Sequence, residues 1–268
     1  MDNVDYLMES EEENIRLEAK TDPAAVEQQA LWAQIRPGMR VADLGCGPGK
    51  TTSVLHGLVQ PGGTAVGADI SEKRIEYARD HYAGQGIEFV CRDIRLPLDE
   101  PESFDFVWIR FVLEYYRSNA FEIVRNVSRV LKPGGTLCLV DLDHNCLNHF
   151  GLSERLERTI IRCARVLEEE FNFDPYTGRK LYSFLYDLGY EHVAVSVSAH
   201  HVIYGPLGYV DAFNWTKKAE MVSRKAGHAF DEYRGGFEEF MEEFTRFFSD
   251  PRRFSYTPLL CARGCKPT

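Results

Sequence analysis

The sequence predicts an α/β fold: a doubly wound, mostly parallel sheet flanked by helices, with a helical cap. Short apolar runs alternate with amphipathic helical segments through the first half of the chain. The runs are mostly continuous in hydrophobicity, as expected of strands that are buried on both faces. Repeated strand–helix units of this kind pair their strands in parallel through crossover helices. The chain of 268 residues, 44% of them hydrophobic, is long enough to bury such a core.

Five strands are expected in the first half, at residues 39–44, 64–69, 87–93, 104–110 and 136–141. The helices between them are expected near residues 50–59, 71–83 and 119–131. Ser71 is the expected N-cap of the second helix, and Lys132–Gly135 is expected to stop the third. The first, second and fourth of these strands are therefore each expected to be followed by a helix.

The two ends of the chain have a different pattern. Residues 5–36 look helical, and Asp22 followed by Pro23 is typical of a helix start. After residue 145, helices are expected at 152–171, 178–188, 207–226 and 236–249, with strands at 192–203 and 253–263. We therefore expect one structural domain with three parts: an N-terminal helical cap segment (1–36), a ligand-binding core (37–144) and the rest of the sheet with inserted cap helices (145–268).

The composition limits the class of protein. A formal net charge of -10 argues against a nucleic acid partner, which calls for a basic face. No apolar run reaches the roughly 18 residues that a membrane span needs. The acidic N-terminus lacks the hydrophobic centre of a secretion signal, so we expect a cytoplasmic location. Seven cysteines without a CxxC pair indicate reduced thiols and no metal site. A monomer and a homodimer both remain open.

A glycine-rich turn follows the first strand. Asp43 is followed by Gly45, Gly47 and Gly49, and glycines at such a turn let a ligand approach backbone N–H groups closely. Asp69 ends the next strand, where it can accept hydrogen bonds from ribose hydroxyls or cap the following helix, with Arg74 as a solvated helix residue. A dinucleotide fingerprint requires G-x-G-x-x-G, and a phosphate loop requires a glycine where Leu44 stands. The spacing therefore disfavours both of these sites.

Four segments together resemble successive motifs of a known family: VADLGCGPGKTT, VGADISEKRIEYAR, EFVCRDIRLPLDEPESFDFVWIRFVLEYY and VLKPGGTLCLVDLD. They are similar to those of class I S-adenosylmethionine-dependent methyltransferases, in particular the small-molecule branch that includes the ubiquinone/menaquinone C-methyltransferases. The likeness is strong over 39–143, weaker in YLMESEEENIRL (6–17) and loose after residue 145. It implies S-adenosyl-L-methionine as the cofactor and a seven-stranded Rossmann-like sheet whose last strand is antiparallel.

The resemblance also implies which residues contact the cofactor. Backbone of the three turn glycines and of Arg110 would lie at its methionine end, and Asp43 would hold the methionine amino group. Asp69 would bind the ribose. By weaker likeness, Arg16 would meet the cofactor carboxylate, although a charged residue on an exposed helix face explains it equally simply. The full set of implied cofactor-binding residues is Tyr6, Arg16, Asp43, Gly45, Gly47, Gly49, Asp69, Ile70, Asp93, Ile94 and Arg110.

A methyl acceptor with a hydroxyl, amine or acidic C–H group needs a nearby proton acceptor. Asp141 and His144 follow the fifth strand, at the edge where open α/β sheets bind ligands, and are the predicted catalytic residues. A strand-end hydrogen-bond acceptor and an exposed loop residue are the alternative interpretations. Glu114, Tyr115 and Tyr116 follow the fourth strand and also face that edge.

The sequence thus predicts methyl transfer from S-adenosylmethionine to a small organic acceptor, aromatic or hydrophobic in character. We expect an apolar acceptor cavity closed by segments 1–20, 145–176 and 205–249, because the sheet alone supplies no roof. Phenylalanines at helical spacing in 237–248 are expected either to line it or to pack within the cap. The alternatives are a non-catalytic S-adenosylmethionine-binding regulatory protein and a nicotinamide-dependent oxidoreductase.

Overall fold

The computed structural model describes residues 13–98, 101–225 and 230–268, and within them the chain folds around one mixed sheet. The strand order is β3-β2-β1-β4-β5-β8-β6, and β7 pairs with β8. The strands are β1 (Arg40–Leu44), β2 (Thr64–Asp69), β3 (Ile87–Cys91), β4 (Phe104–Arg110), β5 (Leu131–Leu142), β6 (His149–Phe150), β7 (Glu191–Tyr204) and β8 (Phe254–Cys265). The predicted doubly wound α/β fold is confirmed.

The direction of the strands agrees with the prediction, and their number does not. Strands β1 to β5 pair in parallel, whereas β8 runs antiparallel to β5, to β6 and to β7. The described residues form eight strands instead of the predicted seven. The additional strand is β6, in which His149 pairs with Ser255 and Phe150 with Phe254. Two residues are too few to produce an alternating pattern, so the sequence does not reveal this strand.

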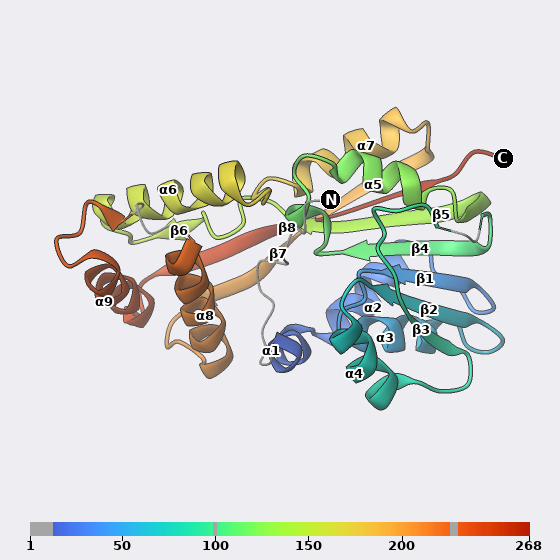
Figure 1. Ribbon diagram of the computed structural model, residues 1–268, viewed down its shortest axis with the longest axis horizontal. Coiled ribbons are helices and arrows are strands. Elements are labelled where there is room, and N and C mark those ends of the chain that lie inside the picture. Colours follow the sequence, from blue (N-terminus) through green and yellow to red (C-terminus); the bar gives the residue numbers. More distant parts are fainter. Residues whose placement is uncertain (1–12, 99–100, 226–229) are drawn as a thin grey trace.

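Some of the helices cover the two faces of the sheet, and others form the cap. They are α1 (Glu13–Lys20), α2 (Pro23–Trp32), α3 (Lys50–Leu58), α4 (Glu72–Tyr82), α5 (Ala120–Val127), α6 (Glu154–Glu170), α7 (Leu181–Asp187), α8 (Tyr209–Lys225) and α9 (Gly236–Ser249). On one face, α2 and α3 pack against Phe106 and Trp108 of β4; on the other, α5 and α7 pack against Val107 and Ile109 (Figure 1). Both faces of β4 are therefore buried, which explains its continuous apolar sequence.

Local chemistry sets the ends of several helices. The helical stretch expected at 5–36 is divided, because Asp22 ends one helix and caps the next: its Oδ1 accepts a hydrogen bond from the Ala24 N–H at 3.0 Å. Ser71 occupies the cap position of α4, but its hydroxyl makes no capping bond. The helix expected to run to residue 131 ends at Val127, because β5 already begins at Leu131.

Helices α6, α8 and α9 gather around the ends of β7 and β8 that project beyond the rest of the sheet (Figure 1). They share a separate apolar core, which we call the cap core, built from Leu156, Trp215, Phe240, Phe244 and other buried side chains. The extended strands therefore carry the cap, and the cap lies beside the carboxyl ends of the parallel strands.

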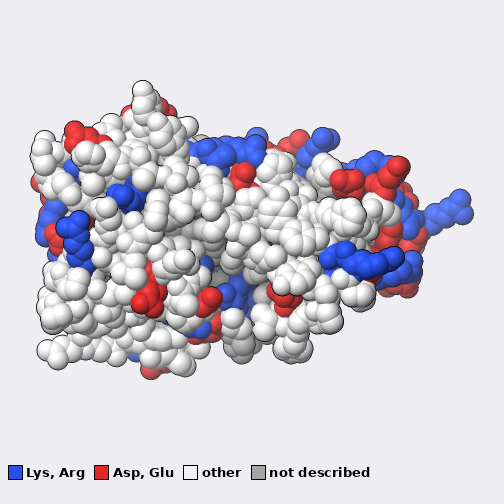
Figure 2. Space-filling model, turned by 180° about the vertical axis from the view of Figure 1, so that it is seen from behind, with Lys and Arg blue, Asp and Glu red and all other residues white. Residues whose placement is uncertain are grey.

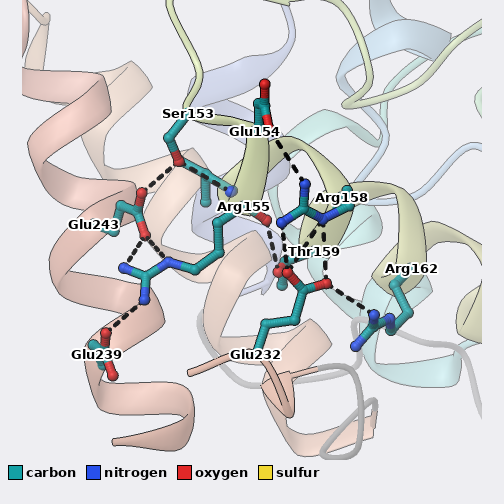
Figure 3. Close-up of polar contacts among 10 residues, drawn as sticks. Ser153, Glu154, Arg155, Arg158, Thr159, Arg162, Glu232, Glu239 and Glu243 are labelled. Carbon is teal, nitrogen blue, oxygen red and sulfur yellow. Dashed lines mark hydrogen bonds and ion pairs between the residues drawn. The ribbon is translucent and has the colours of Figure 1, made fainter. Parts of the chain in front are cut away.

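Ion pairs join α6 to the segment 232–243 (Figure 3). Arg155 contacts Glu239 at 2.8 Å and Glu243 at 2.7 Å, and Arg158 and Arg162 both reach Glu232 at 2.9 Å. Each pair is partly exposed, so each contributes roughly 0–1 kcal/mol. Several pairs sharing their partners nevertheless fix the position of α6 relative to α9, the two helices that form one side of the cap.

The surface carries charges of both signs. On the face opposite to that of Figure 1, basic and acidic side chains are interspersed and much of the surface is uncharged (Figure 2). Within the described ranges, no helix combines the length and the hydropathy that a membrane span requires.

Candidate functional site

Two adjoining hollows lie at the carboxyl edge of the parallel strands. The first, of about 820 Å³, is lined by the ends of β1, β2 and β4, by residues 92–94, by Leu17 of α1 and by Thr21, which follows that helix; we call it the edge cleft. The second, of about 950 Å³, is lined by α1, by residues 145–173, and by α8 and α9; we call it the cap cavity. Tyr115 lines both hollows, so they meet at this residue.

The glycine-rich turn forms the floor of the edge cleft. Gly45, Gly47 and Gly49 all have positive φ, at 84°, 56° and 94°. A Cβ on Gly45 would lie 2.3 Å from Val112 Cγ2, and one on Gly49 would lie 2.8 Å from the Ala78 Cβ. The turn therefore needs glycine at these two positions for both conformation and space, and it leaves backbone exposed to the cleft.

Asp69 organises this turn from the end of β2. Its Oδ2 accepts the Gly47 N–H at 2.9 Å, and its Oδ1 accepts the Ser71 N–H at 3.0 Å and Arg74 Nη1 at 3.1 Å. Asp69 lines the edge cleft, so its role at the helix start and a role in ligand binding are compatible. Arg74 is buried in this ion pair, and its interpretation as a solvated residue is wrong.

The next strand contributes a second carboxylate to the edge cleft. Arg95 holds Asp93 through both carboxylate oxygens, with Arg95 Nη2 at 2.7 Å from Oδ2. Burial raises the pKa of Asp93, but the hydrogen bonds from Arg95 outweigh it and lower the pKa below its ordinary value. Ile94 and Ile70 line the same cleft. Three more of the implied cofactor-binding residues, Ile70, Asp93 and Ile94, therefore lie in the edge cleft together with Asp69.

Asp43 and Arg110 lie at the other side of the turn. Asp43 is 2% exposed, and its Oδ2 accepts the Thr52 hydroxyl at 2.6 Å. Burial raises its pKa from 3.8 to about 7. Arg110 lines the edge cleft, donates from Nε to Gln29 Oε1 at 3.3 Å, and burial lowers its pKa to about 10. The opposite charges of these two residues sit close enough to influence each other.

The pKa of Asp43 predicts a change of stability with pH. The pKa of Asp43 in the folded protein lies above its ordinary value. The contribution of Asp43 to the free energy of unfolding is therefore fully present below about pH 4 and is lost as pH rises to about 7. An uncharged Asp43→Asn side chain avoids this loss. We expect the variant to gain stability over the wild type between pH 4 and pH 8, by up to roughly 4 kcal/mol, as measured by urea unfolding at each pH.

Asp105→Asn is the control. Ion pairing lowers the pKa of Asp105, so the difference in stability between this variant and the wild type should change with pH in the opposite direction. A difference for Asp43→Asn that does not change with pH contradicts the prediction.

The described residues that line the cap cavity come from the three predicted segments, at 16–20, 145–173 and 215–244, and also include Glu114 and Tyr115. Its walls are largely apolar, and Phe240 and Phe244 of the phenylalanine-rich helix line it, while Phe247 and Phe248 pack in the cap core. Both interpretations of these phenylalanines therefore hold, since Phe240 and Phe244 line the cavity and also belong to the cap core. That the cavity receives the methyl acceptor stays a prediction.

The first helix lies against both hollows. Leu17 and Thr21 line the edge cleft, whereas Arg16 and Lys20 line the cap cavity. Arg16 is 5% exposed, so the alternative of an exposed helix residue is wrong. Its predicted contact with the cofactor carboxylate stays untested, since it is not among the residues that line the edge cleft. Tyr6, the other residue assigned by weaker likeness, lies outside the described residues.

The two predicted catalytic residues do not line either hollow. Asp141 is fully buried, and its carboxylate accepts backbone N–H groups of Leu142 at 2.9 Å and Glu114 at 3.2 Å. Burial raises its pKa well above the ordinary value. The His144 ring packs edge-on against Tyr176, 5.1 Å between centroids. In the structure Asp141 therefore acts as a strand-end hydrogen-bond acceptor and His144 packs on Tyr176, and a catalytic role for either residue stays an untested prediction.

Glu114 is the carboxylate that reaches the cap cavity. It is 4% exposed, and its Oε2 accepts Asn145 Nδ2 at 2.7 Å. Burial raises its pKa, against the opposing effects of Lys20 and then Lys218. Burial, followed by the charge of Lys218, lowers the pKa of Lys20 to about 7. Sequence reasoning missed Lys20, Lys218 and Asn145, because charged and polar residues near helix ends usually face solvent.

Comparison with known proteins identifies part of the chain. Residues 42–139 match the methyltransferase domain family. Methyltransferase GfsG of Streptomyces halstedii is 31% identical over 147 residues, which cover 53% of this chain and 51% of that protein. The ubiquinone/menaquinone biosynthesis C-methyltransferase UbiE of Pseudomonas entomophila is 38% identical over 112 residues, covering 40% of this chain and 43% of that protein.

Solved structures share the fold over most of the chain. A Bacillus halodurans protein described as a methyltransferase has a TM-score of 0.61 at 18% identity, covering 91% of this chain and all of its own. Phosphoethanolamine N-methyltransferase 2 of Haemonchus contortus, solved with S-adenosyl-L-methionine, has a TM-score of 0.52 at 15% identity. The match covers 90% of this chain and 52% of that protein. The predicted relationship to S-adenosylmethionine-dependent methyltransferases is confirmed. The matched segment spans about half the length of the curated relatives.

Proposed function

We propose that this chain, whose residues 42–139 carry a methyltransferase domain, transfers a methyl group from S-adenosylmethionine to a small, largely apolar acceptor in the cap cavity. One observation carries the proposal: the edge cleft and the cap cavity meet at Tyr115. A cofactor in the cleft would therefore present a group to a largely apolar cavity. A mostly apolar lining with a few polar groups is typical of small-molecule sites.

The residues of the edge cleft fit this cofactor. The turn backbone at Gly45 and Gly47 is accessible to its methionine end, Asp69 offers carboxylate oxygens for ribose hydroxyls, and Ile94 offers an apolar face for adenine. When bound, the sulfonium supplies an activated methyl group. The protein has to align the acceptor at near-attack distance and exclude water, and the cap helices provide that enclosure.

Glu114 is the proton acceptor in this proposal, for an acceptor molecule that has a proton to lose. It lines the cap cavity close to Tyr115, and its raised pKa makes it a better base than an ordinary carboxylate. Asn145 holds one of its oxygens in a fixed position at 2.7 Å. Lys20 and Lys218 stabilise the ionised form, which is the form that accepts a proton.

The direct test is a methyl-transfer assay with labelled S-adenosylmethionine over a library of small organic molecules, followed by mass identification of the product. We expect transfer to apolar members. S-adenosylmethionine and S-adenosylhomocysteine should bind in calorimetry, and NADH should not compete. Cofactor binding without transfer to any acceptor favours the alternative of a regulatory protein that only binds S-adenosylmethionine. Tighter binding of NADH refutes the cofactor assignment.

Replacing Asp69 by alanine should weaken S-adenosylhomocysteine binding roughly tenfold to a hundredfold, because a charged hydrogen bond contributes about 1.5–3 kcal/mol. The same change leaves the buried Arg74 guanidinium without its carboxylate, which destabilises the fold. The double variant Asp69→Ala/Arg74→Met removes that cation and is the matched control. Calorimetry should give the same weakened affinity for both variants. Wild-type affinity in the folded double variant contradicts the assignment.

A further inference from the structure

Two lysines face the cap cavity from different helices. Lys20 ends α1, Lys218 lies in the middle of α8, and both belong to the lining of the cavity. In the part of the chain that the structure describes, neither ammonium group forms an ion pair with a carboxylate. Lys218 Nζ lies 3.3 Å from the Cys146 sulfur and 5.0 Å from the Trp215 ring, and Lys20 Nζ lies 5.5 Å from the Phe111 ring. Both ammonium groups thus have only weak partners.

The charges around these lysines are unbalanced. Among the described lining residues, Glu114 supplies one carboxylate, and it is already held by Asn145. The neighbouring His200 and His201 have pKa values lowered by burial, so at neutral pH they add no charge. Positive charges in an apolar cavity are costly unless an anion pairs with them. An arriving anionic group would supply the missing partner.

The apolar part of the cavity lies on the cap side. Ile160 and Leu167 of α6, Val222 of α8, and Phe240 and Phe244 of α9 form its wall. Lys20, in contrast, lies near Phe111, which lines the edge cleft. Lys20 therefore lies toward the proposed cofactor, whereas Lys218 lies beside the cap core, over Trp215.

We propose that the molecule recognised in the cap cavity is an amphiphile: an apolar body against α6, α8 and α9, and one anionic group such as a carboxylate between Lys20 and Lys218. This inference rests on the proposed function, since it names the class of acceptor. The anionic end lies at the junction with the edge cleft, so the atom to be methylated belongs to the anionic group or lies next to it.

The test uses two fluorescent probes that share their rings and differ in charge. 8-Anilinonaphthalene-1-sulfonate is anionic, and N-phenyl-1-naphthylamine is the same ring system without the sulfonate. We expect both to bind the wild-type protein, the anionic probe more tightly. Lys218→Met should weaken the anionic probe about tenfold, as for the loss of a charged hydrogen bond, and change the neutral probe less than twofold.

Lys217→Met is the matched control. It removes the same charge from the neighbouring position, where Lys217 pairs with Glu220 at 3.3 Å, and it should change neither probe's affinity. Lys20→Met is the second test variant, in case Lys218→Met does not fold; it should also weaken only the anionic probe. Equal effects on both probes, or no effect of either cavity lysine, overturn the inference. S-adenosylhomocysteine binding, measured on the same variants, separates this outcome from a failure of the proposed function.

Discussion

Replacing Gly45 by alanine should abolish cofactor binding and destabilise the fold. The new Cβ would lie 2.3 Å from Val112 Cγ2, at a backbone φ of +84°. Positive φ costs an alanine about 1–2 kcal/mol, and forcing a methyl group into a packed site adds about 1–3 kcal/mol. The turn can relieve this strain only by moving the backbone that the cofactor would approach. We expect more than a hundredfold loss of S-adenosylhomocysteine affinity in calorimetry, together with about 2–5 kcal/mol lower stability in urea unfolding.

Gly47→Ala is the control for this experiment. Gly47 has a φ of +56°, and the nearest atom to an added Cβ is Leu17 Cδ1, at 3.7 Å. Gly47→Ala therefore has the cost of a positive φ but no steric clash, so this variant should lose only about 1–2 kcal/mol of stability. If Gly45→Ala and Gly47→Ala lose stability equally, close packing against Val112 is not what requires glycine at position 45.

Replacing Glu114 by glutamine should lower the rate of methyl transfer by about a hundredfold to ten-thousandfold, the usual contribution of a positioned proton acceptor. The amide keeps the size of the side chain and can keep the hydrogen bond with Asn145, but it cannot take a proton. The measurement is kcat with the acceptor found in the library assay, together with S-adenosylhomocysteine affinity, which should stay within about threefold of the wild type because Glu114 does not line the edge cleft.

Asp141→Asn is the informative comparison for Glu114→Gln. Asp141 accepts the Glu114 N–H and lines neither hollow, so its replacement should cost stability and leave transfer within about tenfold of the wild type. A larger loss of kcat for Asp141→Asn than for Glu114→Gln, with both variants folded, would show that Glu114 is not the proton acceptor. Normal kcat in Glu114→Gln would show that the acceptor molecule needs no base.

Most of the core could be predicted because its signals are local. The glycine spacing, the acids at the ends of β2 and β3, and the apolar strands are readable within segments of about ten residues. The structure accordingly brings Gly45, Gly47, Asp69 and Asp93 to one cleft. The helices of the cap also follow from their apolar periodicity.

The sequence could not single out Glu114 as the proposed proton acceptor, because the position of its side chain depends on packing between distant segments. Asp141, His144 and Glu114 all follow parallel strands, so the sequence places them at the same edge. A short 3-10 turn at Leu113–Tyr115 directs Glu114 toward the cap, where Asn145 meets it. Asp141, on β5, instead accepts hydrogen bonds from the backbone N–H groups of Leu142 and Glu114. Only the folded arrangement distinguishes these carboxylates.

The β7–β8 ladder has a mechanical consequence for turnover. Its paired residues extend from Glu191 and Cys265, beside the parallel strands, to Tyr204 and Phe254, beneath the cap. This antiparallel ribbon, whose register shifts between Glu191 and Ala194 and again between His200 and Ile203, connects the cap to β5, the neighbour of β8. Swinging the whole cap outward would therefore break backbone hydrogen bonds, an expensive route for a step repeated in every catalytic cycle. We expect molecules to be exchanged instead past α1, which contacts α8, contributes Leu17 to the edge cleft and Lys20 to the cap cavity, and belongs to neither the ribbon nor the sheet.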